Sequence, residues 1–429
     1  MRALKAMRYA ASFGVARALL FAAPIALANL LPLDRYGQFE LAQSYAVIGS
    51  LLLGFGLQGT VPLIRLRNDI EGRWDTLLLL IATLAGGCLL LSGMVAAGMG
   101  TLYSVPVLVL LAIAVLMMQG LWATSLKSDG RSTGAVFLEA GFWVVAVVGA
   151  GLIVLTGSRL PESTITLALL VYAAGLLTVT LKQFNHTRTG SIAVSDMRRN
   201  LALGLPLMFT SVLTVIISSS GRLILGQTPH LEAVGLYAVL YRSTTLPLVA
   251  HQILIIGFFR QIFSWSDELL RARAAVIVLG VSAMVIVFWF LEPWLGWMLG
   301  QRFAEVFGTY RTEGLMLLVQ TILWSAIALN DLINSRLQIA GHVTRLTAPF
   351  LVVGLGALGL WTWGRAQTME FGALLHGFVI GHLCLMAGFY AVQCAASWVL
   401  GHRFIRLWLT VIGCMFATGL LIFFGERFL

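Results

Sequence analysis

Thirteen long apolar runs, separated by short polar turns, limit what this chain can fold into more than any other feature. A helix that crosses a lipid bilayer needs about 20 apolar residues, and these runs are of that order. The pattern predicts an all-α polytopic membrane protein without a soluble domain. The expected spans are 9–32, 38–62, 75–100, 103–126, 133–156, 163–184, 200–226, 234–262, 273–299, 312–339, 344–363, 370–396 and 404–424.

The composition agrees with that prediction and excludes other classes of protein. Hydrophobic residues make up 59% of the chain and charged residues 11%, whereas a soluble domain has roughly 25% charged residues. The net charge of +10 does not indicate a nucleic-acid partner, because the basic residues are scattered over many short loops. The four cysteines lie in apolar runs without CxxC or metal-ligand spacing, so we expect no metal and no cofactor.

The basic residues also predict an orientation. The chain starts with a basic segment and an apolar stretch too long for a signal peptide, so we expect an uncleaved first span. With the N-terminus in the cytoplasm, the inner segments carry 19 of the 28 Lys and Arg residues and the outer segments carry six. The remaining three, Arg17, Arg222 and Arg242, lie within expected spans. An odd number of spans places the C-terminus on the outer side.

Two hairpins of similar sequence indicate an internal repeat. One reads LPLDRYGQFELAQSYAVIG and the other TPHLEAVGLYAVLYRSTTL, with Tyr36-Gly37 and Gly235-Leu236-Tyr237 just after their turns. Their offset equals a block of six helices plus the polar, basic segment 185–199. The prediction is a parallel repeat about an axis along the membrane normal, with a substrate path between the halves.

The opening stretch, RALLFAAPIALANLLPLDRYGQFELAQSYAVIGSLLLGFGLQGTVPLIRL, resembles the polysaccharide-transport branch of the multidrug/oligosaccharidyl-lipid/polysaccharide superfamily. The resemblance rests on the Leu-Pro-x-x-x-Tyr-Gly-x-Phe turn, the glycine-rich second span that ends in Arg65, and Val234-Gly235-Leu236-Tyr237. It implies two six-helix lobes in a V. The expected organisation is an N-lobe over 1–184, a cytoplasmic linker over 185–199, a C-lobe over 200–398 and an added transmembrane helix over 399–429.

The resemblance also implies a function. Members flip undecaprenyl-pyrophosphate-linked oligosaccharide repeat units across the bacterial inner membrane, by alternating access through a cationic cavity. The implied partners are that polyprenyl-linked glycan, the bilayer and the machinery that polymerises or exports the polysaccharide. The C-terminus would then be periplasmic.

Three arginines within spans are the candidate pyrophosphate ligands: Arg17, Arg222 and Arg242. Such residues are costly in hydrocarbon and usually face a cavity, and the planar guanidinium donates two parallel hydrogen bonds to phosphate. Arg222 ends a helical stripe with Thr214 and Ser218. The alternative for each arginine is an interfacial anchor that reaches the membrane surface. That alternative is strongest for Arg222 and weakest for Arg17.

Other polar residues within spans are candidates for cavity lining or ion coupling. Gln320, Asp331 and Asn334 share one face of an apolar helix, which should line the lumen or a helix–helix contact. Asp331 would form a salt bridge, with a cation site as the alternative. Glu139 stands alone, either hydrated at the interface or protonatable. Glu40 and Gln58, which share a face of the second span with Ser44, would line the outer cavity.

Two further functions compete with the flippase. A cation-coupled antiporter for drugs or other small molecules would use the same fold but would need carboxylates in its lumen. A membrane glycan polymerase would need a large outer loop or a paired acid and base, and no loop exceeds about fifteen residues. We therefore expect a transporter and not an enzyme.

Overall fold

The structure, a computed structural model, describes residues 2–66, 73–157, 159–188, 190, 193–228, 231–248, 251, 265–337 and 339–425. All the secondary-structure elements in these ranges are helices. Nine of the described helices are long and apolar enough to cross a membrane. The expected all-α, multi-pass fold is confirmed, and the chain divides into two compact units.

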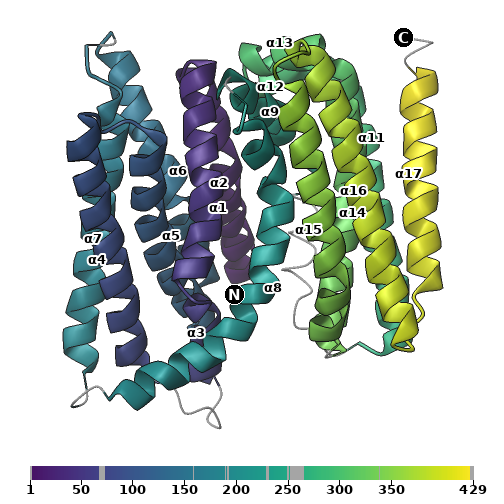
Figure 1. The fold of residues 1–429 in the computed structure, drawn as a ribbon. Helices are drawn as coiled ribbons and strands as arrows, with labels where there is room; N and C mark the ends of the chain where they lie inside the picture. Colours follow the sequence, from purple (N-terminus) through teal and green to yellow (C-terminus); the bar gives the residue numbers. More distant parts are fainter. Residues whose placement is uncertain are drawn as a thin grey trace. The chain divides into compact units, whose positions relative to one another are not determined.

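The first unit comprises Met1–Gly226 and His230–Gly235. Its helices are α1 (Arg2–Leu30), α2 (Leu33–Leu53), α3 (Leu57–Leu66), α4 (Trp74–Met99), α5 (Val105–Ser128), α6 (Ser132–Leu155), α7 (Ser163–Thr187) and α8 (Val194–Leu225). Helix α5 lies at its centre, packed against α2, α3, α4, α6 and α7, while α1 packs on α6 (Figure 1). The apolar faces of these helices form a core of leucine, isoleucine, alanine and aromatic side chains.

The second unit comprises Gln227–Pro229 and Leu236–Leu429. Helix α9 (Leu231–Thr244) therefore begins in the first unit and ends in the second. The other elements are α11 (Asp267–Leu291), η1 (Glu292–Trp294), α12 (Leu295–Leu299), α13 (Gln301–Thr309), α14 (Arg311–Arg336), α15 (Ala340–Arg365), α16 (Phe371–Val399) and α17 (Ile405–Gly425). Helix α14 packs against α16 and α11. The last helix, α17, packs on α11 and α14, with Ser282 and Thr418 joined by a 2.8 Å hydrogen bond between their hydroxyls.

The second expected span, 38–62, is interrupted in the structure. Helix α2 ends at Leu53 and α3 begins at Leu57. Phe55 and Gly56 between them have φ angles of 48° and 66°, and residues in this left-handed region do not continue a right-handed helix. The expectation that Glu40 and Gln58 share one helical face was wrong, because the break separates them and removes the regular spacing.

Helix α8 packs within the first unit. The reason is close backbone packing at the break between α2 and α3. A Cβ atom added to Gly204 would lie 2.3 Å from the carbonyl oxygen of Phe55, and one added to Gly56 would lie 2.3 Å from that of Gly204. Only glycine at both positions permits this approach.

The glycines of the two similar hairpins lie against each other within the first unit. A Cβ atom on Gly37 would be 2.1 Å from the carbonyl oxygen of Leu231 and 2.9 Å from the amide nitrogen of Gly235. A Cβ atom on Gly235 would be 2.2 Å from the carbonyl oxygen of Leu33. Backbone contact between the starts of α2 and α9 explains why each hairpin places a glycine just after its turn.

Candidate functional site

A fully buried ion pair joins two helices of the first unit. Arg222, near the end of α8, donates a hydrogen bond from Nη1 to Oε2 of Glu40 on α2, over 2.6 Å. Only 7% of the Arg222 side chain and none of the Glu40 side chain is exposed. The structure thus buries Arg222 in a contact between helices, so it is not the surface-reaching anchor weighed as the alternative.

Neighbouring residues on the same two helices hold this pair in place. Tyr36, one turn before Glu40, donates its hydroxyl to Oε1 of Glu40 at 2.7 Å, so both carboxylate oxygens accept hydrogen bonds. Ser44 donates to the backbone carbonyl of Glu40 at 2.8 Å. On α8, Nη2 of Arg222 lies 3.4 Å from the carbonyl oxygen of Ser218, one turn earlier. Tyr36 was not among the expected site residues, although its spacing of four from Glu40 was a signal for it.

Gln58 lies in a different site, at the break between α2 and α3. Its Nε2 donates to the backbone carbonyl of Met117 on α5 at 3.3 Å. Gln58 also lines a cavity of about 190 Å³, together with Ser50, Leu51, Gly54, Gly56, Gly59, Thr124 and Ser211. Gln58 therefore lines a cavity at the helix break, whereas the prediction placed it with Glu40 and Ser44 along an outer cavity.

Four expected residues remain: Arg17, Thr214, Arg242 and Glu139. Arg17 lies in α1 and Thr214 in α8, but both side chains are outside the described part of the chain. Arg242 is half-buried in the second-unit part of α9. Glu139 on α6 is not alone, because its carboxylate accepts a hydrogen bond from Nζ of Lys127 on α5.

The expected polar face of α14 packs against α16 in the second unit. Four polar pairs follow one another along this contact: Glu313–His376, Gln320–His382, Asp331–Gln393 and Asn334–Ser397, at 2.8, 3.2, 2.8 and 3.2 Å. Asn330 Nδ2 also reaches Oε1 of Gln393 at 3.5 Å. Of the two expectations for this face, the structure contains the helix–helix contact. Among the described residues, the hydrogen-bond partner of Asp331 is the carboxamide of Gln393, and the side chain of the nearby Arg336 lies outside the described part of the chain.

The sequence did not single out a network where α4 and α8 begin. Arg73 donates to Oδ1 of Asp75 from Nε and to Oδ2 of Asp196 from Nη1, both over 3.1 Å. Asn200, fully buried, donates to the backbone carbonyl of Arg73 at 3.1 Å. Hydrogen bonding and charge attraction from these carboxylates raise the pKa of the Arg73 guanidinium above its ordinary value. The network anchors the start of α8 to the rest of the first unit.

No family model matches this chain, and no curated protein matches it. A solved structure does: the "Inward-facing conformation of a multidrug resistance MATE family transporter of the MOP superfamily" is similar over 89% of this chain and 95% of that one, with a TM-score of 0.58. The two sequences are 14% identical. The chain has the fold of this transporter. At this level of identity the similarity establishes the fold, and it does not identify the substrate of this chain.

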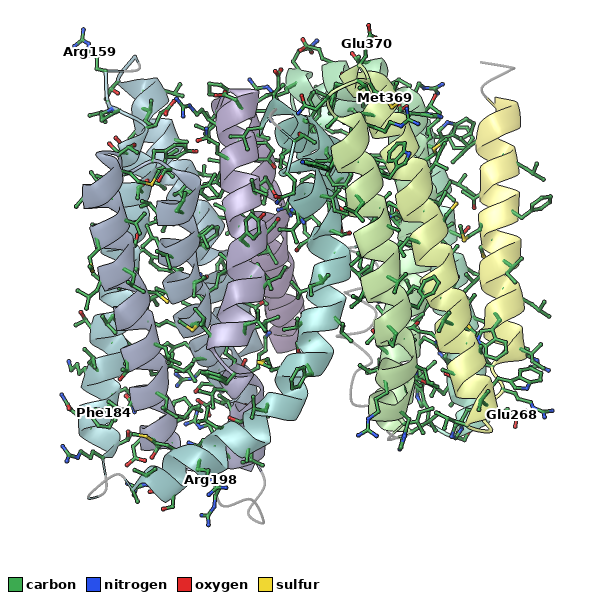
Figure 2. The ribbon with its side chains drawn as sticks, in the orientation of Figure 1. Arg159, Phe184, Arg198, Glu268, Met369 and Glu370 are labelled. Carbon is green, nitrogen blue, oxygen red and sulfur yellow. The ribbon has the colours of Figure 1, made fainter. Side chains whose placement is uncertain are left out.

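On this MATE-type fold, the described residues offer several groups that could bind a ligand. Among them, no group of three or more His, Cys, Asp and Glu side chains could hold a metal ion. The buried Arg222 guanidinium can bind an anion, and the half-buried Asp331 carboxylate with its amide neighbours offers oxygens for a cation or water. The side chains of each unit are drawn in Figure 2.

Proposed function

We propose that this protein is a membrane transporter that moves a lipid-linked oligosaccharide across the bilayer and binds the pyrophosphate of its substrate through arginines within the membrane. The observation that carries this proposal is the guanidinium of Arg222, held inside an apolar helix bundle. A cation in such a place is costly, so it is retained where an anion must be bound. The MATE-type fold and the additional arginines Arg17 and Arg242 support the same function.

Glu40 has a defined part in this proposal. With no substrate bound, its carboxylate compensates the charge of Arg222, which would otherwise be buried alone. A pyrophosphate carries more negative charge than a carboxylate and also accepts bidentate hydrogen bonds from a guanidinium. The substrate would therefore displace Glu40 from Arg222, and Tyr36 would keep its hydrogen bond to the released carboxylate.

A second function is favoured by different observations. A cation-coupled antiporter for small molecules would use carboxylates within the membrane. Glu40 is fully buried, and Asp331 is half-buried and bonded to Gln393. The structural neighbour is itself described as a multidrug resistance transporter. Under this alternative, Glu40 and Asp331 would be the essential residues, and the arginines would serve only to pair with them.

Substitution in cells separates the two proposals. Arg17→Gln and Arg242→Gln variants, with insertion confirmed by membrane fractionation, should each abolish export of a surface glycan in a strain that depends on this chain. Asp331→Asn should leave export largely intact. The reverse result, with export lost only in Asp331→Asn, would contradict pyrophosphate binding by these arginines, and ion-driven uptake of an organic cation that Asp331→Asn abolishes would favour the antiporter. Arg159→Gln, which changes an exposed arginine in a loop, is the matched control.

A further inference from the structure

The first half of α8 has two faces of opposite character. The inner face, at intervals of four residues, consists of Asp196, Asn200, Gly204 and Met208, which are bonded to or packed on the rest of the first unit. The outer face is exposed. It carries Val194, Arg198, Ala202, Leu205 and Phe209, at intervals of three or four residues. One arginine thus lies among apolar side chains on a face that no described element covers.

The charges around this face do not balance. The described carboxylates at this end of the first unit are already paired: Asp75 and Asp196 with Arg73, Asp129 with Arg65, and Glu139 with Lys127. The exposed cations Arg131, Lys182 and Arg198 form no ion pair with any described residue. They lie at the α5–α6 turn, the last turns of α7 and the start of α8. The surface is therefore electropositive and selects an anionic partner.

The position of this exposed face of α8 relative to the membrane follows from the helices around it. In Figure 1, the first part of α8 runs across the lower end of the first unit before the helix turns upward. Helices α4, α5, α6 and α7 are long and apolar enough to span the bilayer, so the end where α5 and α7 terminate lies at the membrane surface. A helix there with exposed apolar and basic side chains lies in the headgroup layer.

We propose that the exposed face of α8, from Val194 to Leu205, together with Lys182 and Arg131, is a binding surface for anionic phospholipids. The cations would hold the headgroup phosphates, while Val194 and Leu205 would enter the acyl region. The site is independent of the transported substrate. Because its inner face is fixed by Arg73 and Asn200, lipid bound here would hold α8, the helix whose last turn contains Arg222.

The test uses the full-length protein in neutral detergent and measures binding of fluorescent phosphatidylglycerol and phosphatidylcholine. The wild type should prefer phosphatidylglycerol, and high salt should weaken that preference. Arg198→Gln with Lys182→Gln should reduce the affinity for phosphatidylglycerol about fivefold per removed charge and leave phosphatidylcholine binding unchanged. Arg159→Gln, an exposed arginine at the opposite end of the same unit in Figure 2, should change neither.

Two further measurements test whether the surface binds a lipid or a free phosphate, and whether the apolar residues contribute to binding. Inorganic phosphate should displace phosphatidylglycerol poorly, and Val194→Ser with Leu205→Ser should weaken lipid binding although every charge remains. These side chains are exposed, so none of the variants should unfold the protein, and thermal unfolding checks this. Equal lipid binding by the Arg198/Lys182 variant and the Arg159 variant would overturn the proposal. Complete displacement of phosphatidylglycerol by inorganic phosphate would also overturn the proposal, because the surface would then be a site for small anions.

Discussion

The Arg222 guanidinium meets the Glu40 carboxylate at 2.6 Å, although the two residues are 182 positions apart in the sequence. Removing either partner alone leaves a buried charge uncompensated, whereas removing both does not. Arg222→Met should therefore reduce the free energy of unfolding by about 3–5 kcal/mol, and Arg222→Met with Glu40→Gln should recover most of that loss. Thermal unfolding in detergent measures the coupling.

The exposed pair Arg35–Glu162 is the control for this cycle. Its atoms approach to 2.9 Å, but 35% and 38% of the two side chains are exposed. Solvent screens such a pair, so Arg35→Met should cost less than about 1 kcal/mol. Additive effects of the Arg222 and Glu40 substitutions would contradict a direct ion pair between them.

Gly56 and Gly100 offer a matched test of the helix break, because both have φ of 66°. Alanine at either position is strained by about 1–2 kcal/mol in the left-handed region. At Gly100 the added Cβ meets open space, whereas at Gly56 it meets the carbonyl oxygen of Gly204 at 2.3 Å. Gly56→Ala should therefore lower the unfolding temperature clearly more than Gly100→Ala does. Equal effects would show that α8 does not pack on the break.

Gly37 tests the backbone contact between α2 and α9. Gly37→Ala places a methyl group 2.1 Å from the carbonyl oxygen of Leu231, so the two helices must separate and the protein should be strongly destabilised. Gly86 in α4 has nothing within 4 Å of an added Cβ. Gly86→Ala should be neutral or stabilise by about 0.5–1 kcal/mol, because alanine favours helix. Thermal unfolding of the two variants measures the difference. Similar changes in unfolding temperature for Gly37→Ala and Gly86→Ala would argue against the contact between α2 and α9.

Gln393 tests the polar contact between α14 and α16. Its Nε2 donates to Oδ1 of Asp331 at 2.8 Å, and it is almost fully buried. Gln393→Leu leaves the Asp331 carboxylate without that donor, which should cost about 1–3 kcal/mol of unfolding free energy. Adding Asp331→Leu should restore stability, because both polar groups are then absent. Thr410→Val, at an exposed hydroxyl bonded within its own helix, is the control and should cost little.

Much of the fold could be predicted because membrane helices are long and uniformly apolar. Helices α4 to α7 begin and end close to the expected spans, and the last expected span, 404–424, is helix α17. The break at Phe55 and Gly56 could not be predicted, because the apolar pattern continues across it. At the break the backbone packs closely on Gly204, which lies in a distant part of the sequence.

The site residues could be selected from the sequence, but their partners could not. Periodicity identified one polar face on α14, and that face is real. The partners of Gln320, Asp331 and Asn334 lie 62 or 63 residues later, on a helix whose polar residues are thinly spaced. Similarly, the sequence predicts that Arg222 and Glu40 both line a cavity, and only their positions in space show that they bind each other. Helix spacing describes one helix, not the helix that packs on it.

The most direct test of the proposed function is a flipping assay in proteoliposomes that contain the purified protein. The measured quantity is the fraction of a fluorescent polyprenyl-pyrophosphate oligosaccharide that becomes accessible to a membrane-impermeant glycosidase. Wild-type protein should expose the inner-leaflet substrate, Arg242→Gln should greatly slow this exposure, and Arg159→Gln should behave as the wild type. Failure of the wild type to move this lipid, together with ion-driven uptake of an organic cation by the same vesicles, would contradict the flippase proposal.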